Sequence, residues 1–331
     1  MVAQLDSLYI KTKPTKALSR LIGYGLFEGR PLTTKGQWIN PLIFKLFAIA
    51  QGLPQLKKVK KPIFIIGTGR SGTTILGIVL SMHKEVGFLN EPKALWHTIY
   101  PEEDLIGSYS QGKADYRLEA ENATDSIKRT AHRLFGAYLT AVASSRLVDK
   151  YPELIFRVPF VRQIFPDAKF IFLARNGWDT CQSIDGWSKR LGTNVQNDTH
   201  DWWGLNNRKW HLLIEQIAAT NSVFKHNLKI IEGYSNHTHM AAVEWILTMQ
   251  EGLKLVEQFP EVVYLLKYEE LVAQPENSLR QLLDFCELPF DEKMVYYAKK
   301  TLNSRQNNRI FSLSPELAPL FEQTMTALGY S

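Results

Sequence analysis

Short apolar runs alternate with longer amphipathic stretches along most of the chain. Buried strands are predicted where the runs are short and rich in β-branched or aromatic residues, at 63–66, 86–89, 169–173 and 262–267. Helices are predicted where apolar residues recur at helical spacing, at 72–82, 127–147, 178–189, 241–259, 275–286 and 315–328. Because strands alternate with helices, we expect an α/β fold, with a parallel sheet flanked by helices in a single domain.

The first 60 residues are predicted to form a helical, basic segment that leads into the main domain at 61–331. Within this segment, the apolar run 41–53 is interrupted by Lys45 and is too short to cross a bilayer. It predicts an amphipathic helix that packs on the domain or makes peripheral contact with a membrane surface, and packing is the favoured interpretation.

The composition of the 331-residue chain is that of a globular protein, with 45% hydrophobic and 22% charged residues. The net charge of +6 is compatible with an anionic ligand. Cys181 and Cys286 lie in apolar stretches without metal-ligand spacing, so we expect two free thiols in a reducing compartment and no metal site. No signal peptide or membrane anchor is visible, which predicts a cytoplasmic protein.

A glycine-rich loop, GTGRSGTT at 67–74, follows the first predicted strand and precedes a helix. Its G-x-G-x-x-G spacing would suit a dinucleotide, with Glu91 as the acid that binds the ribose. Its G-x-x-x-x-G spacing matches the frame of a P-loop, but Thr73 stands where a P-loop needs lysine. A third interpretation is a metal-free anion site at a helix N-terminus. The groups available for it are Arg70, Ser71, Gly72, Thr73 and Thr74.

A second stretch, FPDAKFIFLARNGWDTCQS at 165–183, favours the third interpretation. Arg175 falls at the carboxyl end of a buried strand, where ligands bind in open α/β sheets. Ser183 follows eight residues later, about two turns into the next helix. The two residues can form a second anion site, although Arg175 could instead pair with Asp179. Two anion sites suit a nucleotide that carries phosphates at both ends of its ribose, whereas a hydride-transfer enzyme does not need the second site.

These two stretches resemble the signatures of sulfotransferases that use 3′-phosphoadenosine 5′-phosphosulfate (PAPS). Further segments resemble that family in the same order, at 149–170, 267–290 and 302–306. The arginine in the loop makes the likeness closer to the tyrosylprotein and carbohydrate sulfotransferases than to the small-molecule cytosolic enzymes. The chain departs from the family at Gly69, where proline is common, and at Asn176 and Gly177, where Asp-Pro is common.

The resemblance implies a P-loop-like fold and a metal-free donor site. The loop residues Arg70, Ser71, Gly72, Thr73 and Thr74 would bind the 5′-phosphosulfate. Arg175 and Ser183 would bind the 3′-phosphate, and Tyr268 would contact the adenosine.

The resemblance also implies transfer of a sulfuryl group from PAPS to an acceptor hydroxyl by in-line displacement, with PAP as the product. Lys150 and Ser304 match family residues near the transferring and leaving groups. Glu91, seventeen residues after Thr74, matches the catalytic glutamate of the tyrosylprotein branch and is the expected general base.

Residues from about 184 to 262 match no branch of the family, so the acceptor stays open: a saccharide, a glycolipid, a peptide tyrosine or a metabolite. If residues 192–240 form the acceptor wall, their tryptophans, Trp202, Trp203 and Trp210, would stack on an acceptor or line a lid, and packing in the core is the alternative for any one of them. No nucleic-acid partner is expected. Two other functions are kept as hypotheses, an NAD(P)-dependent dehydrogenase and a catalytically silent nucleotide-binding scaffold.

Overall fold

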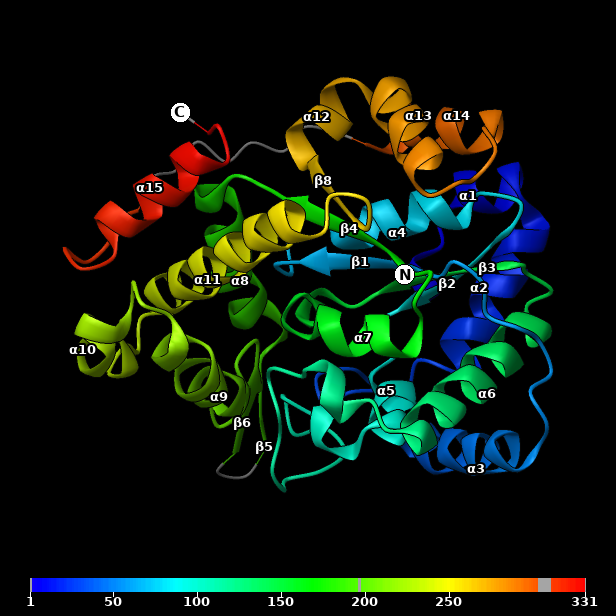
Figure 1. Ribbon diagram of the computed structural model, residues 1–331, viewed down its shortest axis with the longest axis horizontal. Helices are drawn as coiled ribbons and strands as arrows, with labels where there is room; N and C mark the ends of the chain where they lie inside the picture. Colours follow the sequence, from blue (N-terminus) through cyan, green and yellow to red (C-terminus); the bar gives the residue numbers. More distant parts are fainter. Residues whose placement is uncertain (1, 196–197, 303–310, 331) are drawn as a thin grey trace.

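The computed structural model describes residues 2–195, 198–302 and 311–330. Its centre is a five-stranded sheet in the order β2-β3-β1-β4-β8, and every pairing between neighbouring strands is parallel. Helices cover both faces of this sheet (Figure 1). The predicted α/β fold is therefore confirmed. The strands are β1 (Ile63–Gly67), β2 (Val86–Asn90), β3 (Arg146–Lys150), β4 (Lys169–Ala174) and β8 (Val263–Lys267).

Two apolar cores lie on opposite faces of the sheet. In β1, Phe64 and Ile66 belong to one core, whereas Ile63 and Ile65 belong to the other, because side chains alternate along a strand. Burial on both faces explains why β1 and β4 read as nearly continuous apolar runs. The first core includes α5 (Lys93–Ile99), α6 (Asp125–Ala141), α7 (Val158–Ile164), α8 (Gly177–Leu191) and α11 (His237–Gln258). The second includes α4 (Thr73–Ser81), α13 (Pro275–Phe285) and α14 (Glu292–Thr301).

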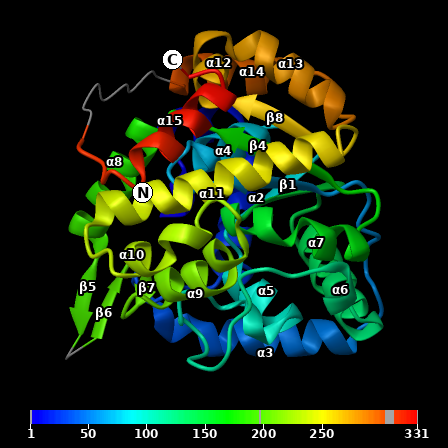
Figure 2. The same cartoon turned by 60° about the vertical axis from the view of Figure 1, so that its left-hand side comes forward.

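The first 60 residues contain the helices α1 (Ser7–Thr12), α2 (Pro14–Leu26) and α3 (Asn40–Gly52). α1 packs against α14, α2 packs against β2, and α3 packs against α5 and α6. Figures 1 and 2 show α3 along the outer side of the molecule, next to α6. Ile43 and Phe47 are buried and join α3 to the first core.

The predicted helix at 127–147 is wrong at its carboxyl end. α6 ends at Ala141, and β3 begins at Arg146. Between them, Ala143 has a left-handed backbone with a φ of 48°, which a continuing helix cannot contain. The strand itself reads RLVDK, so its two apolar residues are too few to show a strand pattern in the sequence.

The region between α8 and α11 holds elements that the sequence did not predict. A small antiparallel sheet is formed by β5 (Thr193–Val195), β6 (Asp198–Asp201) and β7 (Gly204–Leu205). The helices α9 (Arg208–Gln216) and α10 (Leu228–Glu232) follow it. After β8 the chain continues as α12 (Tyr268–Ala273), and α15 (Ala318–Ala327) agrees with the helix predicted at 315–328.

Candidate active site

The carboxyl ends of β1, β3 and β4 meet at one edge of the sheet, because all three strands are parallel. The loop 68–72 leaves β1 at this edge, Lys150 ends β3, and Arg175 directly follows β4. Gly67 begins the turn with a φ of 139°, and a Cβ added there would lie 2.6 Å from a backbone oxygen of β4. Only glycine fits this position, so the sequence fixes where the loop leaves the sheet.

A cavity of about 540 Å³ lies at this edge. All the residues predicted to bind the donor line this cavity, with the exception of Ser71. Several residues that were not predicted line it as well. The predicted residues in the lining are Arg70, Gly72, Thr73, Thr74, Arg175, Ser183 and Tyr268. The others are Ile75, Asp179, Gln182, Arg190 and Thr301. The residues of the two predicted anion sites thus line the same cavity.

Direct contacts join these two anion sites. Arg70 Nε donates a hydrogen bond to Ser183 Oγ over 3.2 Å, and Arg175 Nη1 donates to Arg70 O over 3.2 Å. Arg175 also forms an ion pair with Asp179 at 3.3 Å, the pairing that the sequence offered as the alternative. Its guanidinium carbon lies 4.8 Å from the centre of the Tyr268 ring. Arg175 therefore lines the cavity and pairs with Asp179 at the same time.

Arg190 is a cation at the cavity that the sequence analysis missed. It lies on α8 seven residues after Ser183, about two turns, which places both residues on one face of the helix. This spacing is the sequence signal that could have identified it. Burial lowers the pKa of Arg70, and the charges of Arg190 and Arg175 lower it further against the attraction of Glu91. An anion between these guanidinium groups would relieve their repulsion.

Ser71 is fully buried and does not line the cavity. Within the described ranges, neither Ser71 Oγ nor the buried Thr68 Oγ1 has a hydrogen-bond partner. Buried hydroxyls without partners are uncommon in folded proteins. The guanidinium groups at the cavity and the N-terminus of α4 together fit an anionic ligand such as a phosphate or sulfate ester.

Glu91 and Lys150 form an ion pair at the same edge of the sheet. The strand register brings them together, since Asn90 lies opposite Lys150 and Glu91 N donates to Lys150 O over 2.7 Å. The Lys150 side chain is 2% exposed, whereas that of Glu91 is 37% exposed. Burial acts to raise the pKa of Glu91, but Lys150 and Lys93 outweigh it and hold the pKa below its ordinary value. Glu91 is therefore a carboxylate over the whole neutral range.

A series of alternating charges leads from Glu91 into the interior. Lys93 Nζ lies 3.7 Å from a Glu91 carboxylate oxygen and 3.9 Å from one of Glu153. Lys209 of α9 pairs with Glu153 at 3.3 Å and with Glu244 of α11 at 2.6 Å. Burial would raise the pKa of Glu153, but Lys93 and Lys209 overcome it and lower the pKa to about 2. We call this series the charge chain, with the members Lys150, Glu91, Lys93, Glu153, Lys209 and Glu244.

Trp202 connects the charge chain to the glycine-rich loop. Its Nε1 donates to Glu244 over 2.7 Å, and Lys209 Nζ lies 4.6 Å from its ring centre. The ring faces Gly69 so closely that an added Cβ would lie 2.3 Å from Trp202 Cη2. The ring thus fills the space that a proline at this position would need. Trp187 packs edge to face on Trp202 with 5.5 Å between ring centres, and both tryptophans are partly exposed.

Two of the three tryptophans expected in an acceptor wall, Trp203 and Trp210, are core residues. Both side chains are buried, and they pack edge to face with 5.6 Å between ring centres. Both belong to the first apolar core, so the alternative of core packing is correct. Their neighbour Trp202 is the tryptophan that reaches the loop.

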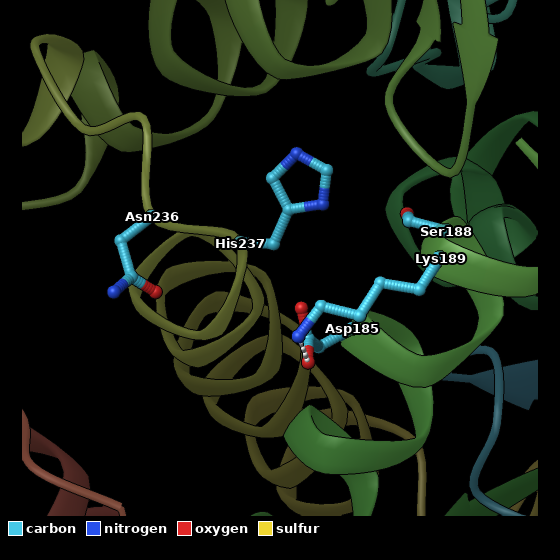
Figure 3. Close-up of a pocket in the computed structure, with 5 residues that line it drawn as sticks. All are labelled: Asp185, Ser188, Lys189, Asn236 and His237. Atoms are coloured by element: carbon cyan, nitrogen blue, oxygen red, sulfur yellow. Dashed lines mark hydrogen bonds and ion pairs between the residues drawn. The ribbon is translucent and has the colours of Figure 1, made fainter.

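A second cavity, of about 430 Å³, lies on a different face of α8 (Figure 3). Its lining contains none of the residues predicted for the donor and consists of Asp185, Ser188, Lys189, Asn236 and His237. Lys189 pairs with Asp185 at 2.7 Å, which neutralises both charges. The second cavity therefore lacks the excess positive charge of the first.

Other sequence predictions concern single residues. Ser304 lies outside the described residues. Cys181 and Cys286 are free and buried, and burial raises the pKa of the Cys286 thiol to about 12. Within the ranges that the structure describes, no group of three or more histidine, cysteine, aspartate or glutamate side chains could hold a metal ion.

Known proteins resemble the chain in sequence. A sequence model described as "Sulfotransferase family" matches residues 62–226 and 215–292, more than half of the chain. An uncharacterized protein of Aquifex aeolicus is 28% identical over 283 residues, which cover 81% of this chain and 31% of that protein. Protein-tyrosine sulfotransferase A of Caenorhabditis elegans is 21% identical over 239 residues, which cover 71% of this chain and 52% of that protein. The chain thus spans about a third to a half of the length of these two relatives.

The fold also has a solved counterpart. The sulfotransferase domain from the curacin biosynthetic pathway matches with a TM-score of 0.50 at 19% sequence identity. The match covers 83% of this chain and 99% of that domain. At this identity the likeness shows a shared fold.

Proposed function

Because the chain belongs to the sulfotransferase family, we propose that it transfers a sulfuryl group from PAPS to an acceptor hydroxyl and releases PAP. The observation that carries the proposal is the single cavity lined by the glycine-rich loop together with Arg175 and Ser183. A nucleotide with anionic groups at both ends of its ribose needs two such sites at once. The hydrogen bond from Arg70 to Ser183 supports the proposal, because it joins one residue predicted for each site.

The donor would be bound by the loop at one end and by α8 at the other. Arg70 and the backbone amides at the start of α4 would bind the 5′-phosphosulfate. Arg175 and Ser183 would bind the 3′-phosphate, and Arg190 would add a further guanidinium at the same cavity. Tyr268, whose ring lies so close to the loop that a Cβ on Gly72 would approach it to 2.4 Å, would contact the adenosine.

When bound, PAPS supplies an activated sulfur atom with PAP as the leaving group. Glu91 would take the proton of the acceptor hydroxyl as the hydroxyl oxygen bonds to sulfur and the bond from sulfur to the 5′-phosphate oxygen breaks. Lys150 would balance the negative charge on the transferring group. Only 2% of the Lys150 side chain is exposed, so little water screens its charge. Weak screening strengthens the attraction between the ammonium and the negative charge on the transferring group.

The acceptor side is proposed to be the pair of partly exposed rings, Trp187 and Trp202. An acceptor that approaches the loop at Gly69 would meet the Trp202 ring. Tryptophan faces stack on flat ring faces, so this pair suits a sugar ring or a phenol. It favours a saccharide, a glycolipid or a tyrosine over an acyclic metabolite.

Calorimetric titration with PAP in the presence of EDTA tests the donor, with NAD⁺ and NADP⁺ as controls. We expect saturable PAP binding without divalent metal and no binding of either dinucleotide. Incubation with sulfur-labelled PAPS and representatives of each acceptor class then tests transfer. Binding of NAD(P) in place of PAP would overturn the donor assignment, and PAP binding without transfer to any acceptor would favour the silent scaffold.

A further inference from the structure

The outer face of α3 is apolar and uncovered within the part of the chain that the structure describes. Its inner face carries Ile43 and Phe47, which are buried against the body of the molecule. Its outer face carries large hydrophobic side chains that continue beyond both ends of the helix. These exposed residues are Trp38, Leu42, Leu46, Ile49, Leu53 and Leu56. Figures 1 and 2 show that α3 runs along the outside of the molecule.

Helical spacing places Trp38, Leu42, Leu46 and Ile49 in one stripe, and Leu53 and Leu56 follow the end of the helix. Trp38, Leu42 and Ile49 recur at intervals of about one or two helical turns, so they point to the same side. Trp38 is 82% exposed and Ile49 is 62% exposed. Single exposed hydrophobic side chains are common on protein surfaces, whereas a contiguous group of them indicates a contact surface. We call the six residues from Trp38 to Leu56 the α3 apolar stripe.

The segment that carries this stripe has positive charge and no acidic residue of its own. The sequence has no aspartate or glutamate between Glu28 and Glu85. Four lysines in or next to the stripe are exposed: Lys35, Lys45, Lys58 and Lys60. Among the described residues, no ion pair is formed by any of these four. A surface of this kind is complementary to an anionic partner.

We propose that the α3 apolar stripe docks on the surface of an anionic lipid bilayer. The leucine and isoleucine side chains would enter the boundary between headgroups and acyl chains, and the lysines would remain at the phosphates. Trp38 is suited to this boundary, because its ring is apolar and its N–H is polar. None of the described helices is long and apolar enough to cross a membrane, so the contact lies in the plane of the surface.

Charge favours the bilayer over a second copy of this chain. Two copies that met through the stripe would bring their lysines together, and like charges at an interface are unfavourable. An anionic bilayer gains from the same lysines, by about fivefold in binding for each one near the surface. The proposal does not depend on the sulfotransferase activity, because the stripe shares no residue with the donor cavity.

Co-sedimentation with vesicles tests the proposal. We expect the protein to bind vesicles that contain phosphatidylglycerol, to bind pure phosphatidylcholine vesicles weakly, and to be released by salt. The variant Leu42→Asp/Ile49→Asp should lose about tenfold or more in vesicle affinity. Ile230→Asp is the matched control, because Ile230 on α10 is 51% exposed and lies outside the stripe. Its vesicle affinity should equal that of the wild type.

Three further readouts separate the possible outcomes. PAP affinity and thermal melting should be unchanged in the stripe variant, which excludes unfolding as the cause. Tryptophan emission should shift to the blue with vesicles in the wild type and shift less in Trp38→Phe. Equal vesicle binding by the stripe variant and the wild type would overturn the proposal. So would a wild-type dimer that ignores vesicles and dissociates in the stripe variant, since that result places a second copy on the stripe.

Discussion

Replacing Glu91 with glutamine tests the general base and separates catalysis from stability. The amide keeps the shape of the side chain and one oxygen acceptor, but it cannot take a proton. Turnover is expected to fall by roughly 10²–10⁴, which corresponds to about 3–5 kcal/mol in the barrier. PAP affinity should stay close to the wild-type value, because Glu91 does not line the donor cavity.

The stability effect of Glu91→Gln should be smaller than its catalytic effect. The variant leaves the Lys150 ammonium, which is 2% exposed, facing a neutral amide. Hydrogen bonds to charged groups contribute roughly 1.5–3 kcal/mol. Because Glu91 is 37% exposed and water can replace part of the contact, we expect a loss of about 1–2 kcal/mol in the free energy of unfolding. Denaturant titration measures this loss.

Glu287→Gln is a matched control for this substitution. Glu287 also has a left-handed backbone, with a φ of 53° against 50° for Glu91, and its carboxylate also pairs with a lysine, Lys61. It follows α13 near the opposite edge of the sheet, where Lys61 precedes β1. Its substitution should leave turnover at the wild-type level. If Glu91→Gln keeps near-normal kcat while folded, the base lies elsewhere and the argument fails.

The pH dependence of turnover gives a second check on Glu91. A general base acts in its deprotonated form, so its contribution is present above its pKa and disappears as the pH falls through it. Lys150 and Lys93 hold the pKa of Glu91 below the ordinary value of 4.5 despite the opposing effect of burial. In the pH-rate profile, the loss of turnover caused by protonation of Glu91 should therefore lie below pH 4.5. Between about pH 6 and 8, protonation of Glu91 should not limit the rate.

Three other substitutions probe the donor site, the acceptor side and the buried core. Arg175→Ala should weaken PAP binding by about tenfold or more, because it removes hydrogen bonds to a charged group; unchanged affinity by calorimetry in a folded variant would contradict the 3′-phosphate site. Trp202→Ala should raise the acceptor KM and leave PAP affinity near the wild-type value, whereas a lower melting temperature with unchanged KM would make the ring a packing residue. Burial raises the pKa of Asp149 to about 8, although the hydrogen bond from Trp96 acts to lower it. Ionising this buried carboxyl costs stability, so Asp149→Asn should stabilise the protein more as the pH rises. In the wild type, the stability that comes from protonated Asp149 is fully present below about pH 4 and is lost as the pH rises towards 8. The difference in melting temperature between variant and wild type should therefore grow from pH 5 to pH 8. A difference that stays constant over this range would refute the prediction.

Two of the strands, and the residues that line the cavity beside them, could be predicted because their signals are local. β1 and β4 are continuous apolar runs, and each is followed directly by the residues that line the cavity. β3 was missed because Leu147 and Val148 are its only apolar residues and the polar residues around them are buried by tertiary contacts. A strand of this kind is specified by its neighbours in the sheet rather than by its own sequence.

The contacts of Glu91 could not be predicted, because they depend on register and on distant segments. The pairing of β2 with β3 brings Glu91 to Lys150 across nearly 60 residues of sequence. Lys209 and Glu244 join the same charge chain from α9 and α11, and no periodic pattern relates them to Glu91. Trp202 could not be told apart from Trp203 and Trp210 for the same reason, since its partial exposure and its contact with Gly69 appear only when the β5–β7 region is folded against the loop.

The close approach of Trp202 to Gly69 links two parts of the chain in evolution and in engineering. Position 69 cannot take a larger side chain while Trp202 keeps its place, since an added Cβ would overlap the ring. A proline at position 69 would fit only after the tryptophan had been lost or moved. A chimera that receives the β5–β7 region from another sulfotransferase should therefore receive the matching loop residue with it.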